Sequence, residues 1–371
     1  MDKHIENKTT DLEYRETYYE SDVVEGHAPE PVARLNGKER SAGAFQCAKS
    51  RRKYWIILSS MVVLGLLFTA GLIWYDNPMP VTHPGFRLIA ERRLEAVLVM
   101  IIVAVCQALA TVAFQTVTNN RIITPSIMGF ESLYTVIHTA TIFFLGSTAL
   151  LQTRSLSMFL AQMGVMVLLT LVLYTWLLSG KRGNMHAMLL VGIILGGGLG
   201  SVATFMQRTL TPSEFDVLSA RLFGSVNNAE AEYFPIAIPL VAIAGLLLLL
   251  SSRRLNVIAL GREATTNLGV NHRASAIFTL ILVSILMAVS TSLVGPMTFL
   301  GFLVATLAYQ FADTYDHRFV FPMSVTIAFV VLTGSYFIMN HIFNAQGVVS
   351  IIIEMIGGSV FLFVILRKGR L

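Results

Sequence analysis

Charged side chains are scarce in this sequence. Asp, Glu, Lys and Arg make up 13% of its 371 residues, whereas soluble proteins average about 25%. The charges are also unevenly spread, because residues 1–53 hold 20 of the 49. With a mean hydropathy of +0.67, the chain cannot be an ordinary soluble domain, and we expect residues 54–371 to lie in lipid.

Cysteine and catalytic motifs are also lacking. Two cysteines, Cys47 and Cys106, are too few for a disulfide framework or a thiolate metal site. The eight histidines form no HExxH pair, and no Gly-x-Ser-x-Gly elbow occurs. The run Gly180–Gly183 lacks the spacing of a phosphate loop. We therefore expect no enzyme, no metal and no cofactor bound by this chain, with any ATP handled by another subunit.

Long apolar runs are what the sequence does have. They predict an all-α integral membrane protein of about ten transmembrane helices, at approximately 54–74, 94–116, 126–146, 156–178, 187–206, 234–250, 274–294, 298–312, 319–340 and 348–366. At 1.5 Å per helical residue, the 54–74 run spans roughly 30 Å of hydrocarbon.

The basic residues predict the orientation. Arg51-Arg52-Lys53 abuts the first span, and the loops on that side hold 14 Lys and Arg against 6 on the other. This bias predicts that both termini are cytoplasmic. It also accounts for the net charge of +5, so nucleic acid is not an expected partner.

Residues 1–53 form a separate region. They carry ten acidic and ten basic residues with few aromatics, which predicts a disordered cytoplasmic tail. They do not resemble a signal peptide. A start codon placed too early in the gene is the alternative explanation.

The cytoplasmic loop 251–273 is longer than a turn needs. Asn256–Leu260 can form a short helix that Gly261 ends, and Arg262–Leu268 a second that Gly269 ends. Such a two-helix elbow would present a knob to a soluble partner, formed by Leu260, Arg262, Glu263 and Leu268. A basic loop held by lipid headgroups is the other interpretation, and the spacing alone does not separate the two.

Two glycine patterns interrupt the spans. Gly192, Gly196 and Gly200 recur every four residues, which is typical of a stripe that lets another helix approach closely. Gly295-Pro296 precedes the short 298–312 span and predicts a broken or partly re-entrant helix. Such a break is tolerated only where protein or water satisfies the freed backbone groups.

Carboxylates in hydrocarbon are costly and usually face a cavity or a partner. Glu131 and Glu354 are the two nearest to it. We expect Glu131 to lie at the cytoplasmic boundary, paired with Arg121. Glu354 lies about two turns into the last span and is the sharper candidate for a pathway wall, with a gating or hydrogen-bonding role.

Several motifs together resemble the FecCD-type permeases of ABC importers, a family with a BtuC-like, type II fold. The resemblance covers residues 54–371 in colinear order. It is carried by Ala259-Leu260-Gly261 with Ala264 and Leu268-Gly269, by Thr118–Arg121 with Thr124–Ser126 and Gly129, by Gly295–Gly301, by Asp316–Arg318, and by Ile356–Gly358.

The resemblance implies partners and roles. A second permease, two ATPase subunits and an external binding protein would complete the importer in a bacterial inner membrane. The ATPase-coupling residues would be Ala259, Leu260, Gly261, Arg262, Glu263, Ala264, Leu268 and Gly269. The pathway and gating residues would be Gly192, Gly196, Gly200, Gly295, Pro296, Phe299, Gly301 and Glu354.

Arg92 and Arg93 lie at the outer start of the second span, against the positive-inside trend. Ordinary headgroup snorkelling would explain them. The resemblance instead implies docking of the binding protein, with His341 able to share that role if protonated.

The sequence of residues 118–134 is most similar to the branch of the family that serves catecholate-type ferric siderophores. Haem or a corrinoid is the alternative cargo within the family. An ion-coupled secondary transporter, which would need buried carboxylates in mid-span, and a membrane enzyme are the rival classes.

Overall fold

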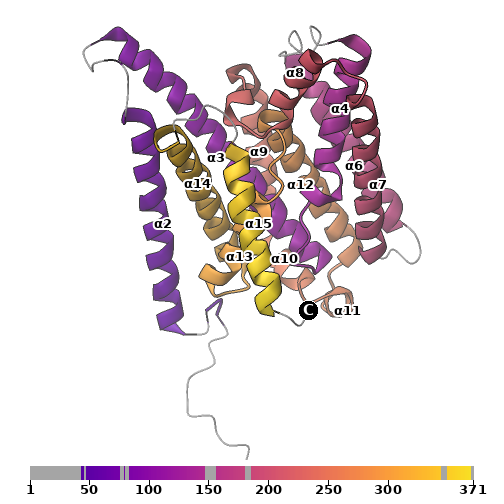
Figure 1. The fold of residues 1–371 in the computed structure, drawn as a ribbon. Coiled ribbons are helices and arrows are strands. Elements are labelled where there is room, and N and C mark those ends of the chain that lie inside the picture. The colour runs from indigo at the N-terminus through magenta and orange to yellow at the C-terminus, as the bar shows by residue number, and fades with distance from the viewer. Residues whose placement is uncertain are drawn as a thin grey trace, which may run out of the picture. The chain divides into compact units, whose positions relative to one another are not determined.

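Helices alone make up the regular structure in the described part of the chain (Figure 1). The computed structural model describes residues 43–45, 47–75, 79, 83–146, 156–179, 185–343 and 349–368, all in a unit that begins at Gly43. Most of the predicted disordered tail, 1–53, lies outside the described residues.

Each of the ten predicted spans coincides with a helix. These helices are α2 (Ala48–Trp74), α3 (Pro84–Thr118), α4 (Phe130–Leu145), α6 (Leu156–Ser179), α7 (Met185–Gln207), α9 (Phe234–Leu250), α12 (His272–Val294), α13 (Leu300–Ala312), α14 (His317–His341) and α15 (Val349–Lys368). Within the described residues, six helices are long and apolar enough to cross a membrane, and four shorter apolar helices accompany them. The all-α membrane fold is confirmed.

Shorter elements connect these helices. They are the α-helices α8 (Pro212–Leu222), α10 (Ser252–Ile258) and α11 (Arg262–Asn267), and the 3-10 helices η1 (Ser126–Met128), η2 (Val226–Asn228) and η3 (Ala231–Tyr233). Figure 1 shows α10 and α11 at one end of the helical bundle and α8 at the opposite end. Below we call these the elbow end and the opposite end.

The centre of the bundle is formed by α3 and α12. In their most apolar windows, 83% of α3 and 72% of α12 is buried, against 11% of α2. Helix α2 packs mainly against α14 and leaves most of its apolar surface exposed, as expected for a helix whose outer face meets lipid.

Two helices begin earlier than predicted. Helix α3 starts ten residues before the expected span at 94, because His83 caps it by accepting a hydrogen bond from the Gly85 N–H (3.1 Å) and a proline follows in the first turn. Helix α2 starts at Ala48. Ahead of it, Phe45 is buried against Tyr54 and Phe319, so packing against the helices begins before the first predicted span.

The loop between α7 and α9 contains a helix that the span prediction did not include. Thr211 and Glu214 form a capping box at the start of α8, in which the Thr211 N–H donates to the Glu214 carboxylate (3.0 Å). The same bonds lower the pKa of Glu214 below its usual value. A Thr-x-x-Glu spacing is a readable signal of a helix start, so this element could have been found from the sequence.

The predicted break after α12 is confirmed. Helix α12 ends at Val294, and the Gly295 that caps it has a φ of +88°, which suits glycine. The freed Val294 carbonyl accepts hydrogen bonds from the Ser225 N–H (2.8 Å) and the Asn228 side chain (3.3 Å). The protein itself therefore satisfies the backbone at this break.

Candidate functional site

The elbow consists of α10 and α11, joined through Gly261. The chain turns there with φ +90° at Gly261, and it leaves α11 with φ +80° at Gly269. The Gly261 N–H bonds to the Ile258 carbonyl (3.0 Å), and the Gly269 N–H bonds to the Thr266 carbonyl (2.9 Å). Both glycines therefore end helices as predicted, although α10 begins at Ser252 rather than at Asn256.

The outer surface of the elbow is apolar at two points. Leu260 is 62% exposed and Leu268 is 60% exposed, with Arg262 and Glu263 exposed between them. Behind this surface the buried hydroxyl of Thr265 lies 2.6 Å from the Gly261 carbonyl and 3.0 Å from that of Val257. The elbow is thus fixed from within while its leucines project outward.

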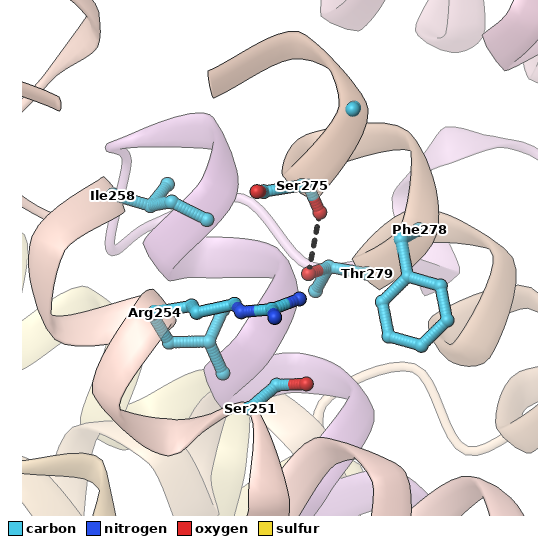
Figure 2. Close-up of a pocket in the computed structure, with 8 residues that line it drawn as sticks. Ser251, Arg254, Ile258, Ser275, Phe278 and Thr279 are labelled. Carbon is cyan, nitrogen blue, oxygen red and sulfur yellow. Dashed lines mark hydrogen bonds between the residues drawn. The ribbon is translucent and has the colours of Figure 1, made fainter. Parts of the chain in front are cut away.

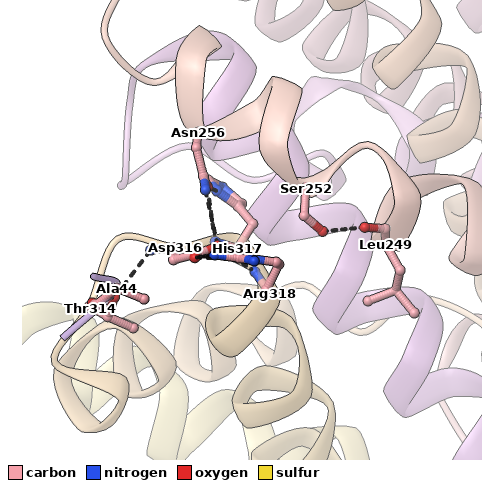
Figure 3. Close-up of polar contacts among 8 residues, drawn as sticks. All are labelled: Ala44, Leu249, Ser252, Asn256, Thr314, Asp316, His317 and Arg318. Carbon is pink, nitrogen blue, oxygen red and sulfur yellow. Dashed lines mark hydrogen bonds and ion pairs between the residues drawn. The ribbon is translucent and has the colours of Figure 1, made fainter. Parts of the chain in front are cut away.

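A set of polar contacts, here called the polar latch, joins the elbow to the bundle (Figure 3). Its members are Asn256 of α10, Asp316, His317 and Arg318 at the start of α14, and Thr116 of α3. The Asn256 side-chain amide donates to Asp316 Oδ1 (3.0 Å). Its oxygen accepts from the His317 N–H (3.0 Å) and lies 2.6 Å from His317 Nδ1.

The latch continues into the central helix α3, because His317 Nε2 lies 2.6 Å from the Thr116 hydroxyl. At its other side Asp316 caps α14, accepting from the Arg318 N–H (3.0 Å) and pairing with the Arg318 guanidinium at 2.6 Å. A displacement of α10 would therefore strain contacts to both α14 and α3.

Asp316 keeps its charge in this setting. Burial favours the neutral acid, but hydrogen bonds from Arg318 and Asn256 outweigh burial and lower the pKa of Asp316 to about 2. The sequence pointed to Asp316–Arg318 through the resemblance alone. Asn256 was expected only as the start of a helix, and no sequence signal identifies its partner 60 residues away.

The glycine stripe packs within the chain. A Cβ on Gly196 would lie 3.1 Å from the Cα of Gly129, and one on Gly192 would lie 2.6 Å from the end of Met128. A Cβ on Gly200 would meet only Ser132, at 4.0 Å. The predicted close approach is therefore confirmed for Gly192 and Gly196, and the approaching elements are η1 and the start of α4.

The Gly295–Gly301 run is a packing junction as well. A Cβ on Gly301 would lie 2.2 Å from the Thr111 hydroxyl of α3, and one on Gly357 of α15 would lie 2.7 Å from Phe299. The Pro296 carbonyl leaves no room for a side chain on Gly224, at 2.2 Å. The pathway roles expected of Gly295, Pro296, Phe299 and Gly301 remain predictions.

Glu131 does not pair with Arg121 as expected. The Thr298 hydroxyl, in the break before α13, donates to Glu131 at 2.6 Å. Arg121 instead lies over the rings of Tyr309 (4.6 Å) and Tyr315 (5.4 Å), an arrangement that favours a cation. Glu354 is half-buried on α15, and its gating role remains a prediction.

Two of the three predicted docking residues have contacts within the chain. Arg93 donates to the Leu72 (3.2 Å) and Tyr75 (2.9 Å) carbonyls at the end of α2. His341 packs against the Tyr75 ring, with centroids 5.2 Å apart, and its Nδ1 lies 3.1 Å from the Phe337 carbonyl. Arg92 is exposed, so it is the better placed of the three to meet a binding protein.

These features together define a polytopic, all-helical membrane protein with an exposed elbow at one end. The FecCD transport family matches residues 55–367, and the chain belongs to that family. It is 55% identical to the petrobactin import system permease protein FatC of Bacillus anthracis, over 91% of this chain and 95% of FatC.

Other comparisons agree. The petrobactin import system permease protein YclO of Bacillus subtilis is 36% identical over 84% of this chain and 95% of its own length. FatD, a second petrobactin permease protein of B. anthracis, is 23% identical over 86% of this chain and 92% of its own length. A solved inward-facing structure of a metal-chelate type ABC transporter has the same fold, with a TM-score of 0.71 at 21% identity, covering 84% of this chain and 99% of that chain.

Proposed function

We propose that this chain is a permease subunit of an ABC importer for a ferric siderophore, with ferric petrobactin as the cargo. The observation that carries the proposal is the 55% identity to FatC, which extends over 95% of that protein. The catecholate type expected from residues 118–134 is part of this proposal. Alternating access of a central pathway would move the cargo.

The elbow is the proposed contact with a partner ATPase. Two exposed leucines on a surface fixed from behind are suited to a soluble partner. The polar latch would transmit movement of α10 to α14 and α3, so Asn256 is proposed as a positioning residue for coupling. An external binding protein would dock at the opposite end, near Arg92.

The companion permease is proposed to be a different chain. Two permease proteins of the petrobactin system of B. anthracis resemble this chain to very different degrees, 55% for FatC and 23% for FatD. A FatD-like subunit is therefore the proposed partner across the pathway. We also infer cytoplasmic termini, since α2 begins and α15 ends at the elbow end (Figure 1) and the positive-inside bias favours it.

Uptake of radioactive iron tests the proposal. Iron-starved cells lacking the gene would be offered ferric petrobactin, other ferric siderophores, haem and a corrinoid, with and without the gene restored. We expect loss of uptake for ferric petrobactin alone, recovery on complementation, and no recovery when the partner ATPase is catalytically dead. Loss confined to haem or a corrinoid would replace the cargo, and recovery independent of the ATPase would favour an ion-coupled carrier.

A further inference from the structure

A cavity of about 270 Å³ lies between α10 and α12, beside the elbow. Its lining combines apolar side chains with one cation and three hydroxyls: Ser251, Arg254, Leu255, Ile258, Ala274, Ser275, Phe278 and Thr279. None of these residues is acidic. The volume is close to the lower end of the range for small-molecule sites, about 300 Å³.

The polar groups of this cavity can all donate hydrogen bonds. Figure 2 shows the Arg254 guanidinium extending across the cavity toward Thr279, with Ser251 and Ser275 beside it. Among the described residues, Arg254 has no carboxylate partner, and the Ser251 and Ser275 hydroxyls have no hydrogen-bond partner. The Thr279 hydroxyl donates to the Ser275 carbonyl (2.9 Å) and can still accept.

A guanidinium with two free hydroxyls is suited to an anion with several oxygens, above all a phosphate group. Ala274 and Ser275 lie in the first turn of α12, where the helix dipole also favours negative charge. The remaining lining is apolar, which would suit the carbon chain of a phosphate ester better than a fully hydrated ion.

The cavity lies where the chain leaves the hydrocarbon. Leu249 and Leu250, at the end of α9, are 43% and 72% exposed, and Ser251 follows directly. Phe278, one turn into α12 beyond Ser275, is also exposed. Apolar surface therefore reaches the mouth of the cavity from the bilayer side, at the level where lipid headgroups lie.

We propose that this cavity binds a phosphate group through Arg254, Ser251 and Ser275, and that a phospholipid headgroup of the cytoplasmic leaflet supplies it. The bound headgroup would bridge α10 and α12 at the base of the elbow. This inference does not depend on the cargo or on the ATPase, whereas the choice of the cytoplasmic leaflet rests on the proposed orientation of the chain.

Native mass spectrometry of the purified full-length chain tests the proposal. Delipidated protein would be titrated with phosphatidylglycerol and, separately, with inorganic phosphate. Arg254→Gln should weaken binding of phosphatidylglycerol roughly tenfold, which is the loss expected for a hydrogen bond to a charged group. Arg253→Gln is the matched control, because Arg253 is exposed but does not line the cavity.

A second variant keeps the cation in place. Ser251→Ala combined with Ser275→Ala should weaken binding without altering the charge of the elbow. If the Arg254 variant loses binding of phosphatidylglycerol alone, the cavity is a headgroup site. If it loses binding of both probes, the cavity is a phosphate site open to soluble ligands. Equal binding of both probes by the Arg254 and Arg253 variants would overturn the proposal.

Discussion

The residues predicted to contact partner proteins are exposed at one end of the helical bundle and bound within the chain at the other. At the elbow end, Leu260 and Leu268 project outward, and a polar latch runs inward behind them. At the opposite end, Arg93 and His341 contact α2 and α14 of the same chain. The comparison teaches that a residue expected to bind a partner protein is exposed for that contact only where it makes no contact within its own chain.

The difference has a simple physical origin. The last carbonyls of a helix have no partners within that helix. At the elbow, glycines in the left-handed region supply backbone N–H groups that close these ends. At the end of α2 no glycine does so, and the Arg93 guanidinium bonds the free carbonyls instead.

The largest expected effect comes from Gly261→Pro. Proline fixes φ near −65°, so it cannot adopt the +90° of Gly261 and should displace α11. We expect siderophore uptake to fall to background while the protein remains in the membrane. Gly146→Pro is the matched control at the opposite end, where φ is +80° and an N–H bond to a carbonyl is also lost. If Gly261→Pro takes up as much siderophore as an active Gly146→Pro variant, the coupling role of the elbow is refuted.

Asn256→Ala should have the next largest effect. It removes the contacts to Asp316 and His317 but leaves the outer surface of the elbow intact. In proteoliposomes with the partner subunits, we expect the ATP consumed per cargo molecule to rise roughly fivefold or more, the lower end of coupling effects. Asn227→Ala, an exposed asparagine at the opposite end, should leave the ratio unchanged. A loss of stability with an unchanged ratio would make the latch merely structural.

A substitution at Gly196 tests how tightly α7 packs against the start of α4, between the two ends of the bundle. Gly196→Ala places a Cβ 3.1 Å from backbone and should destabilise the protein by about 1–3 kcal/mol. Gly197→Ala meets nothing within 4 Å, so its melting temperature should be unchanged or slightly higher. The check is thermal unfolding of the purified variants, and similar melting temperatures would show that the α4–α7 contact is loose.

The smallest effects concern the opposite end. Arg93→Ala should cost about 1 kcal/mol of stability through lost hydrogen bonds and leave the affinity for the binding protein unchanged. Arg92→Ala should instead slow binding-protein association without changing the melting temperature. If Arg93→Ala weakens binding of the binding protein and Arg92→Ala does not, Arg93 is the docking residue instead.

Much of this fold could be predicted from the sequence, because hydrocarbon requires long apolar runs and backbone breaks need glycine or proline. The ten apolar helices, the elbow glycines and the break at Gly295 all follow from these local rules. The partner of Glu131 and the latch through Asn256 could not be predicted. Both depend on contacts between residues 60 or more positions apart, and no local pattern records them.

Cysteine-directed photo-cross-linking in the assembled transporter tests the central claim most directly. Leu260→Cys at the elbow and Phe144→Cys at the opposite end would each be labelled in a Cys47→Ser background, since Cys106 is buried. Both positions are similarly exposed in the isolated chain, at 62% and 73%. We predict an adduct with the ATPase from position 260 and none from position 144. No ATPase adduct from position 260 in an active transporter would contradict the account.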